Sequence, residues 1–184
     1  MKFVCLGDSL TFGYGVRYAS RWVNVTGRAL GLEVHNFAVN GDTTFGMLSR
    51  FDALPLDEET VLFIMAGVND IFYSASCDVA RAGLGTLIHR ALTAGVRLVV
   101  GIPMQIGSGF YPEEWSRAVD FAGARQLIGE YRDWAMRFCD AFSVPYIDFG
   151  DAWPDEYYLD GLHPNEQGHA YMAEKVIQCL RSVI

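Results

Sequence analysis

The chain begins with the sequence KFVCLGDSL at residues 2–10, and this stretch decides how the rest of the chain is interpreted. The run from Lys2 to Leu6 is short, apolar and partly β-branched, a pattern typical of a strand buried in a parallel sheet. Gly7 then predicts a sharp turn that holds Ser9 just beyond the carboxyl end of the strand. Ligands of open parallel sheets bind at this edge, so Ser9 is a candidate nucleophile.

Strand-like and helix-like segments alternate along the whole chain. The predicted strands are Lys2 to Leu6, Glu33 to Ala38, Val61 to Ala66, Arg97 to Ile102 and Pro145 to Phe149. The predicted helices are Ser20 to Leu30, Thr44 to Phe51, Asp78 to Ala94, Glu113 to Phe142 and Asn165 to Val183. This alternation predicts an α/β fold in which helices cover both faces of a five-stranded parallel sheet. Because no repeat or linker divides the chain, we expect a single domain over residues 1–184.

Composition argues against several kinds of partner. The formal net charge of −8 disfavours nucleic acid, because affinity for its phosphates depends on Lys and Arg. No apolar run approaches the ~20 residues that span a bilayer, so we expect no membrane span. The apolar N-terminal run leads into the candidate active-site turn, so we expect a cytoplasmic protein unless a preceding leader has been removed. The four cysteines lack metal-ligand spacing, and we expect neither a metal nor another cofactor.

Polar residues follow the predicted strands at the edge where ligands bind. Besides Ser9, these are Gly41 in the sequence NGDT at residues 40–43, Asn69 in GVND at residues 67–70, and Asp160 and His163 in DGLHP at residues 160–164. The carboxyl ends of parallel strands lie at one edge of the sheet, so we expect these residues to converge there.

Acyl transfer by a serine explains this combination. A serine hydroxyl is a weak nucleophile, and His163 can take its proton and return it to the leaving group. Asp160, three residues before that histidine, can fold back to orient the ring and stabilise its charged form. The developing oxyanion needs donors aimed at it. The candidate donors are the backbone amides of Ser9 and Gly41 and the side-chain amide of Asn69.

With these four motifs in order over nearly its whole length, the chain resembles the GDSL, or SGNH, hydrolases, a family of lipases, esterases, thioesterases and carbohydrate acyl esterases. The resemblance implies that Ser9 is the nucleophile, His163 the general base and acid, and Asp160 its partner. It also implies an oxyanion hole made of Ser9, Gly41 and Asn69, and a three-layer α/β/α domain similar to flavodoxin. The sequence lacks the GxSxG elbow of ordinary α/β-hydrolases, which argues against that fold.

Aromatic residues gather near the predicted site and suggest its substrate. The predicted pocket residues are Tyr14, Phe45, Phe72, Tyr73, Phe110 and Tyr158. A mostly apolar pocket would suit an acyl chain or aryl group, so the expected substrate is a small lipid-like or aryl ester or thioester. Aromatic side chains also stack on sugar rings, and a carbohydrate O-acetylesterase is therefore the alternative within the same family.

Two readings of a different class are also open at this point. The residues Asp8, Asp42, Asp70, Asp160 and His163 could together hold a divalent metal for phosphoester hydrolysis, since carboxylates and imidazole are suitable ligands. Ser9 and Asn69 would then have no task. The other reading is a binding module that keeps the fold and lacks activity.

Overall fold

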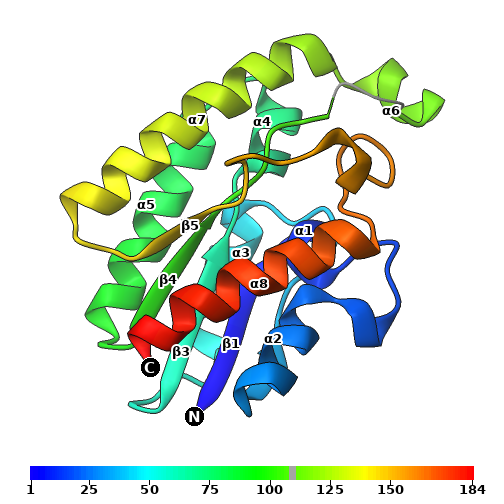
Figure 1. The fold of residues 1–184 in the computed structure, drawn as a ribbon. Helices are drawn as coiled ribbons and strands as arrows, with labels where there is room; N and C mark the ends of the chain where they lie inside the picture. Colours follow the sequence, from blue (N-terminus) through cyan, green and yellow to red (C-terminus); the bar gives the residue numbers. More distant parts are fainter. Residues whose placement is uncertain (108–110) are drawn as a thin grey trace.

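The computed structural model describes residues 1–107 and 111–184, and these contain a parallel sheet of five strands in the order β2-β1-β3-β4-β5 (Figure 1). The strands are β1 (Lys2–Gly7), β2 (Glu33–Asn36), β3 (Thr60–Met65), β4 (Arg97–Ile102) and β5 (Tyr146–Asp148). This order is that of flavodoxin-like sheets, and it reverses direction at β1. The switch point therefore lies between β1 and β3, the strands that precede Ser9 and Asn69.

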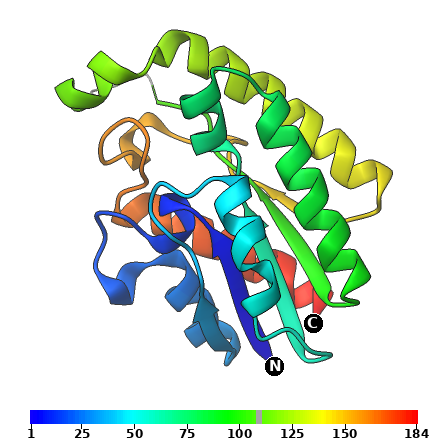
Figure 2. The same ribbon diagram turned by 180° about the vertical axis from the view of Figure 1, so that it is seen from behind.

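Helices cover both faces of the sheet, which confirms the predicted three-layer α/β/α architecture. On one face lie α2 (Trp22–Leu30) and α8 (Glu166–Val183), which pack against each other (Figure 1). The opposite face is covered by α3 (Thr44–Arg50), α5 (Asp78–Thr93) and α7 (Phe121–Ala141) (Figure 2). Among the described residues, no helix is long and apolar enough to cross a membrane.

The strand boundaries differ from the prediction by one or two residues. Strand β4 has the predicted limits, β1 extends to Gly7, and β3 is shifted by one residue toward the N-terminus. The regular strand β2 ends at Asn36, two residues before the predicted end at Ala38, although the backbone amides of Phe37 and Val39 still donate to the Cys5 and Gly7 carbonyls of β1 at 2.8 and 3.0 Å. The Asn36 side chain accepts the Ala38 amide at 3.1 Å in this segment, which leads to the loop that carries Gly41.

The predicted long helix from Glu113 to Phe142 is wrong, because two helices occupy this range: α6 (Glu113–Ala118) and α7. Val119, between them, has an extended backbone with φ −124° and ψ 129°. Asp120 then starts α7 by accepting the Gly123 amide at 3.1 Å. Aspartate side chains favour this capping bond over a helix interior, which explains where the break occurs.

Other short helices were not predicted, because one or two turns give little periodic pattern to read. They are α1 (Ser9–Phe12), α4 (Val68–Ser74) and the 3₁₀ turns η1 (Tyr18–Ser20), η2 (Phe51–Ala53) and η3 (Asp155–Tyr157). The η1 turn is the reason that the helix predicted from Ser20 begins at Trp22.

The central strands are buried beyond their first residues, and they position the residues that follow them. Phe3, Phe63 and Phe149 surround Trp22, with ring centroids 4.9 to 6.3 Å from its own. Burying each such ring stabilises the fold by about 1.5–3 kcal/mol. The Trp22 indole also donates to the Leu10 carbonyl at 2.9 Å. The core is thereby tied to the short helix that presents Ser9.

The start of α4 depends on a glycine. Gly67 has a φ of 105°, and a Cβ atom there would lie 2.4 Å from the Tyr131 ring. The Tyr131 hydroxyl donates to the Ala66 carbonyl at 2.8 Å, so the ring is fixed beneath this turn. Only glycine satisfies both the positive φ and the close packing, and the turn sets where Asn69 emerges.

Candidate active site

Ser9 is the first residue of α1, directly after β1. The Asp8 side chain caps this helix by accepting the Leu10 amide at 2.9 Å. Gly7 allows the helix to fold tightly back, since a Cβ atom there would lie 2.4 Å from Thr11 Oγ1. The sharp turn predicted at Gly7 is therefore present, and it brings Ser9 to the wall of a cavity with only 8 % of the residue exposed.

His163 and Asp160 lie in one turn beside Ser9. His163 Nε2 is 2.9 Å from Ser9 Oγ, and His163 Nδ1 is 2.8 Å from Asp160 Oδ2. The other carboxylate oxygen, Asp160 Oδ1, accepts the backbone amides of Leu162 at 3.1 Å and His163 at 2.7 Å. A single carboxylate therefore both closes the turn and orients the ring. Distances below 3.2 Å are within reach of proton transfer.

The surroundings of this pair are closed and aromatic. The ring centroid of His163 lies 4.4 Å from that of Tyr14 and 5.5 Å from that of Trp115. Burial by itself would raise the pKa of Asp160, but the hydrogen bonds from His163 and Leu162 outweigh it and lower that pKa below its usual value. Asp160 is consequently ionised at neutral pH, as an orienting carboxylate must be.

Gly41 lies in a tight turn that follows β2. The Asp42 amide donates to the Val39 carbonyl at 3.2 Å, and Gly41 within this turn has a φ of 74°. This conformation is strained for other residues. Gly41 lines the same cavity as Ser9 and His163.

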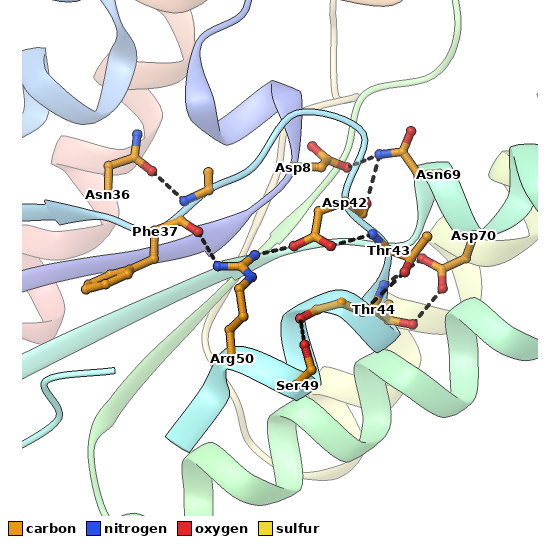
Figure 3. Close-up of polar contacts among 12 residues, drawn as sticks. Asp8, Asn36, Phe37, Asp42, Thr43, Thr44, Ser49, Arg50, Asn69 and Asp70 are labelled. Carbon is orange, nitrogen blue, oxygen red and sulfur yellow. Dashed lines mark hydrogen bonds and ion pairs between the residues drawn. The ribbon is translucent and has the colours of Figure 1, made fainter. Parts of the chain in front are cut away.

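Asn69 connects the turn at Gly41 with the turn at Ser9. Its side-chain amide donates to the Asp42 carbonyl at 2.9 Å and, more weakly, to Asp8 Oδ2 at 3.3 Å (Figure 3). The residues predicted as oxyanion-hole donors, Ser9, Gly41 and Asn69, all line one cavity. The structure therefore brings together the four motifs that the sequence singled out.

The carboxyl group of Asp8 is unusually deeply buried. Only 1 % of this residue is exposed, and burial raises the pKa of Asp8 to about 7. The nearby carboxylates of Asp42 and Asp70 act in the same direction. Asp70 itself accepts the Thr44 amide at 2.9 Å and the Thr44 hydroxyl at 2.7 Å, which joins α4 to the start of α3 (Figure 3).

The cavity has a volume of about 390 Å³. Its polar lining residues are Ser9, Asn40, Gly41, Asn69 and His163. Its apolar and aromatic lining residues are Tyr14, Phe72, Tyr73, Trp115, Val119, Phe121 and Leu162. Aspartate, glutamate, lysine and arginine do not occur among these lining residues, so the cavity suits an uncharged, partly apolar ligand.

Three of the six predicted pocket residues line the cavity, namely Tyr14, Phe72 and Tyr73. The prediction is wrong for Phe45, which is 76 % exposed on α3 and outside the cavity lining. It is also wrong for Tyr158, whose hydroxyl donates to the Gln105 carbonyl and whose ring centroid lies 5.7 Å from that of Trp153. Both residues are close to the motifs in sequence but lie outside the cavity lining. Phe110 lies outside the described residues.

Five lining residues were not among the predicted site residues: Asn40, Trp115, Val119, Phe121 and Leu162. Trp115, Val119 and Phe121 lie around the break between α6 and α7. Phe121 is held by Phe72, with centroids 6.0 Å apart, and by Tyr111, which stacks on it at 3.9 Å. The capping signal at Asp120 could have indicated the break, and with it the residues that turn toward the site.

The carboxylates considered as metal ligands have other partners. Asp42 pairs with Arg50, Asp70 is engaged by Thr44, and Asp160 by His163. In the part of the chain that the structure describes, no three His, Cys, Asp or Glu side chains are grouped so that they could hold a metal ion. The five residues of the metal reading therefore do not form one ligand set.

Comparison with known proteins gives a family and a fold. The sequence profile of the "GDSL-like Lipase/Acylhydrolase family" matches residues 5–171. A member of the lipolytic protein G-D-S-L family from Veillonella parvula is 24 % identical, with a TM-score of 0.82 over 97 % of each chain. No match to this chain was found among curated protein sequences.

Two further solved structures have the same fold. The M. smegmatis aryl esterase is 22 % identical, with a TM-score of 0.85 over 100 % of this chain and 99 % of that one. A carbohydrate acetylesterase from Sinorhizobium meliloti is 19 % identical, with a TM-score of 0.83 over 100 % of this chain and 99 % of that one. At these identities the likeness establishes the fold.

Proposed function

Because the chain belongs to the GDSL-like lipase/acylhydrolase family, we propose that it is a serine esterase that hydrolyses small aryl or lipid-like esters and thioesters through an acyl-enzyme intermediate. The observation that carries this proposal is the continuous series of contacts from Asp160 through His163 to Ser9, at 2.8 and 2.9 Å. Ser9 lines a cavity in which no aspartate, glutamate, lysine or arginine occurs among the lining residues. This combination has a use in acyl transfer and little use in a binding module.

In the first step, Ser9 Oγ attacks the ester carbonyl carbon while His163 Nε2 takes the hydroxyl proton. Asp160 Oδ2 accepts the hydrogen bond from His163 Nδ1 and stabilises the positive charge that develops on the ring. The protonated Nε2 then donates to the leaving alcohol or thiol, and the carbon–oxygen or carbon–sulfur bond breaks. Ser9 is left as an ester of the acyl group.

The oxyanion formed during attack needs donors that are already in place. The backbone amides of Ser9 and Gly41 and the Asn69 side chain supply them in this proposal. The Asn69 hydrogen that faces Asp8 is the one offered to the oxyanion, because its 3.3 Å bond is weaker than the 2.9 Å bond to the Asp42 carbonyl. A preorganised donor of this kind accelerates turnover about 10²- to 10³-fold.

In the second step, water takes the place that the leaving group has vacated. His163 Nε2 removes a proton from this water as the water oxygen attacks the acyl carbon, and it then gives the proton to Ser9 Oγ as the bond between the acyl carbon and Oγ breaks. The same donors stabilise the second oxyanion, and the carboxylic acid departs.

The residues that line the cavity favour the binding of an uncharged acyl or aryl group. Phe72, Val119, Phe121 and Leu162 supply apolar surface, and the lining lacks charged side chains that would bind an ionic substrate. A carbohydrate O-acetylesterase is the second candidate, since Tyr14 and Tyr73 are 40 % and 74 % exposed at the cavity and aromatic faces of this kind stack on sugar rings.

Covalent labelling tests the reaction class. A fluorophosphonate should modify Ser9 alone, and Ser9→Ala should abolish labelling and lower kcat by about 10⁴-fold or more with little change in Tm. A chelator should leave the activity of the wild-type protein unchanged. Activity retained by Ser9→Ala, or lost to the chelator, would contradict a serine esterase and favour the phosphoesterase reading.

A substrate panel then tests the specificity. Nitrophenyl esters of increasing chain length, matched thioesters and acetylated sugars should be compared by kcat/KM. We expect aryl esters of short chains to be preferred, and Phe121→Ala to shift the optimum toward longer chains by enlarging the cavity. A preference for acetylated sugars over every nitrophenyl ester would favour the carbohydrate acetylesterase instead.

A further inference from the structure

Arg50, the last residue of α3, reaches back to the loop that carries Gly41. Its Nη1 donates to the Phe37 carbonyl at 2.7 Å, and its Nη2 pairs with Asp42 Oδ2 (Figure 3). These two contacts lie at the two ends of the segment 37–42, so the planar guanidinium spans the whole loop. The side chains of this pair are 30 % and 11 % exposed, which limits screening by water.

Asp42 connects Arg50 to the active site, because its second carboxylate oxygen, its backbone amide and its backbone carbonyl bond to other residues. Its Oδ1 accepts the Thr43 amide at 3.0 Å, its backbone amide closes the turn with Val39 at 3.2 Å, and its backbone carbonyl accepts the Asn69 side chain at 2.9 Å. Gly46 makes room for the carboxylate, because a Cβ atom there would lie 1.9 Å from Asp42 Oδ1. The residue is therefore held on several sides.

We propose that Arg50 is a positioning residue which, through Asp42, sets the Gly41 amide and the Asn69 side chain as oxyanion donors. The inference rests on the proposed esterase function. Arg50 is outside the cavity lining, so it acts through the loop and does not contact the substrate.

The chemistry of the guanidinium suits this task. Its rigid fork can bind a carbonyl and a carboxylate in one fixed geometry, whereas a lysine ammonium is a single point charge. Loss of Arg50 would leave the Asp42 carboxylate without its cation and the two ends of the loop unconnected. A displacement of the donors by about 1 Å is enough to lower turnover by about 100-fold.

The chain contains a matched control in Arg90 of α5. Arg90 also donates to a backbone carbonyl, that of Leu48 at 3.2 Å, and pairs with a carboxylate, that of Asp52. Its side chain is 34 % exposed, close to the 30 % of Arg50. It contacts the same stretch of chain, α3 and the following turn, but at residues that do not reach the cavity lining.

Steady-state kinetics of Arg50→Gln and Arg90→Gln on a nitrophenyl ester test the proposal. We expect Arg50→Gln to lower kcat about 10- to 100-fold with KM within about threefold, and Arg50→Lys to recover part of the loss. Arg90→Gln should leave kcat within about twofold. If Arg50→Gln does not fold at the assay temperature, Asp42→Asn carries the same test, since it removes the ion pair and keeps the side-chain shape.

A double-mutant cycle separates positioning from general destabilisation. In an Asn69→Ala background, Arg50→Gln should lower kcat by a smaller factor than in the wild-type background, because one of the two donors that it positions is already gone and only the Gly41 amide is left to be displaced. An equal loss of kcat in both backgrounds, or an unchanged kcat in Arg50→Gln alone, would overturn the proposal. Ser9→Ala measured in the same series reports on the esterase itself: if it stays as active as the wild type, the proposed function fails, whatever Arg50 does.

Discussion

Two turns meet at Ser9, and they are held in different ways. The turn at residues 160–163 is largely self-contained, because the Asp160 carboxylate accepts two backbone amides of the turn and a hydrogen bond from the ring of His163, although the Gly107 amide also donates to the Gly161 carbonyl at 2.8 Å. The loop at residues 37–42 depends on residues from other elements, namely Arg50 of α3 and Asn69 of α4.

The turn at residues 160–163 is held mainly by a residue of its own, whereas the loop at residues 37–42 is held by residues of two helices. A turn that is closed by its own side chain keeps its geometry with little help from the rest of the fold. A loop tied to two helices keeps its geometry only while these helices are packed correctly. We therefore expect changes in the first turn to act mainly on the chemistry, and changes around the loop at residues 37–42 to act on both geometry and stability.

The largest effect is expected from Asp160→Asn. The remaining oxygen of the amide can still accept the backbone amides of Leu162 and His163, so the turn should persist. The new NH₂ group, however, faces His163 Nδ1 and favours the wrong tautomer of the ring. We expect kcat to fall by about 10⁴-fold, with a small change in Tm by calorimetry. A large loss of Tm would show that the turn is not self-contained.

A smaller loss is expected from Asn69→Ala. The substitution removes one proposed oxyanion donor and leaves the Asp42 carbonyl without its partner. We expect kcat to fall about 10²- to 10³-fold, together with a measurable drop in Tm. The control is Asn24→Ala, because Asn24 also donates its amide to a carbonyl, that of Tyr18 at 2.7 Å, but lies in α2. A comparable loss of kcat in the control would argue against a specific role for Asn69.

The smallest effect is on the pH dependence of the free energy of unfolding. Asp8, which contacts Asn69, and Asp160 should contribute to it with opposite signs. The pKa of Asp8, beside Asn69, is raised to about 7 by burial, whereas an unfolded aspartate ionises near ~4. Between these values the folded state binds the additional proton, so the free energy of unfolding contributed by Asp8 falls as pH rises. The pKa of Asp160 is lowered, so its contribution is present at neutral pH and is lost only on acidification.

Urea unfolding at several pH values measures this contrast. Asp8→Asn cannot titrate, so its stability relative to the wild type should increase between pH 4 and 7, by up to about 1 kcal/mol per pH unit. Asp160→Asn should instead lose stability relative to the wild type as pH rises toward ~4, where an unfolded aspartate ionises, because the lowered pKa of Asp160 stabilises the wild type above that pH. A difference between Asp8→Asn and wild type that does not change with pH would contradict the raised pKa of Asp8.

The sequence predicted the sheet, its five strands and the family, because buried parallel strands are continuous apolar runs and the four motifs follow them directly. It also named the residues that meet around Ser9. It failed where one local bond overrides a longer pattern, as at Asp120, which divides the helix predicted from Glu113 to Phe142. The pocket residues Trp115, Val119 and Phe121 were missed for that reason.

The sequence by itself therefore determined the order of the strands along the chain, the motifs at their ends and the pairing of Asp160 with His163, since three residues and a glycine turn suffice to bring these two together. Only the tertiary structure decided which aromatic side chains face the cavity. It also decided that Arg50 spans the loop at residues 37–42. These contacts depend on how helices pack across the sheet, and the side-chain direction that results is not encoded in any short stretch of residues.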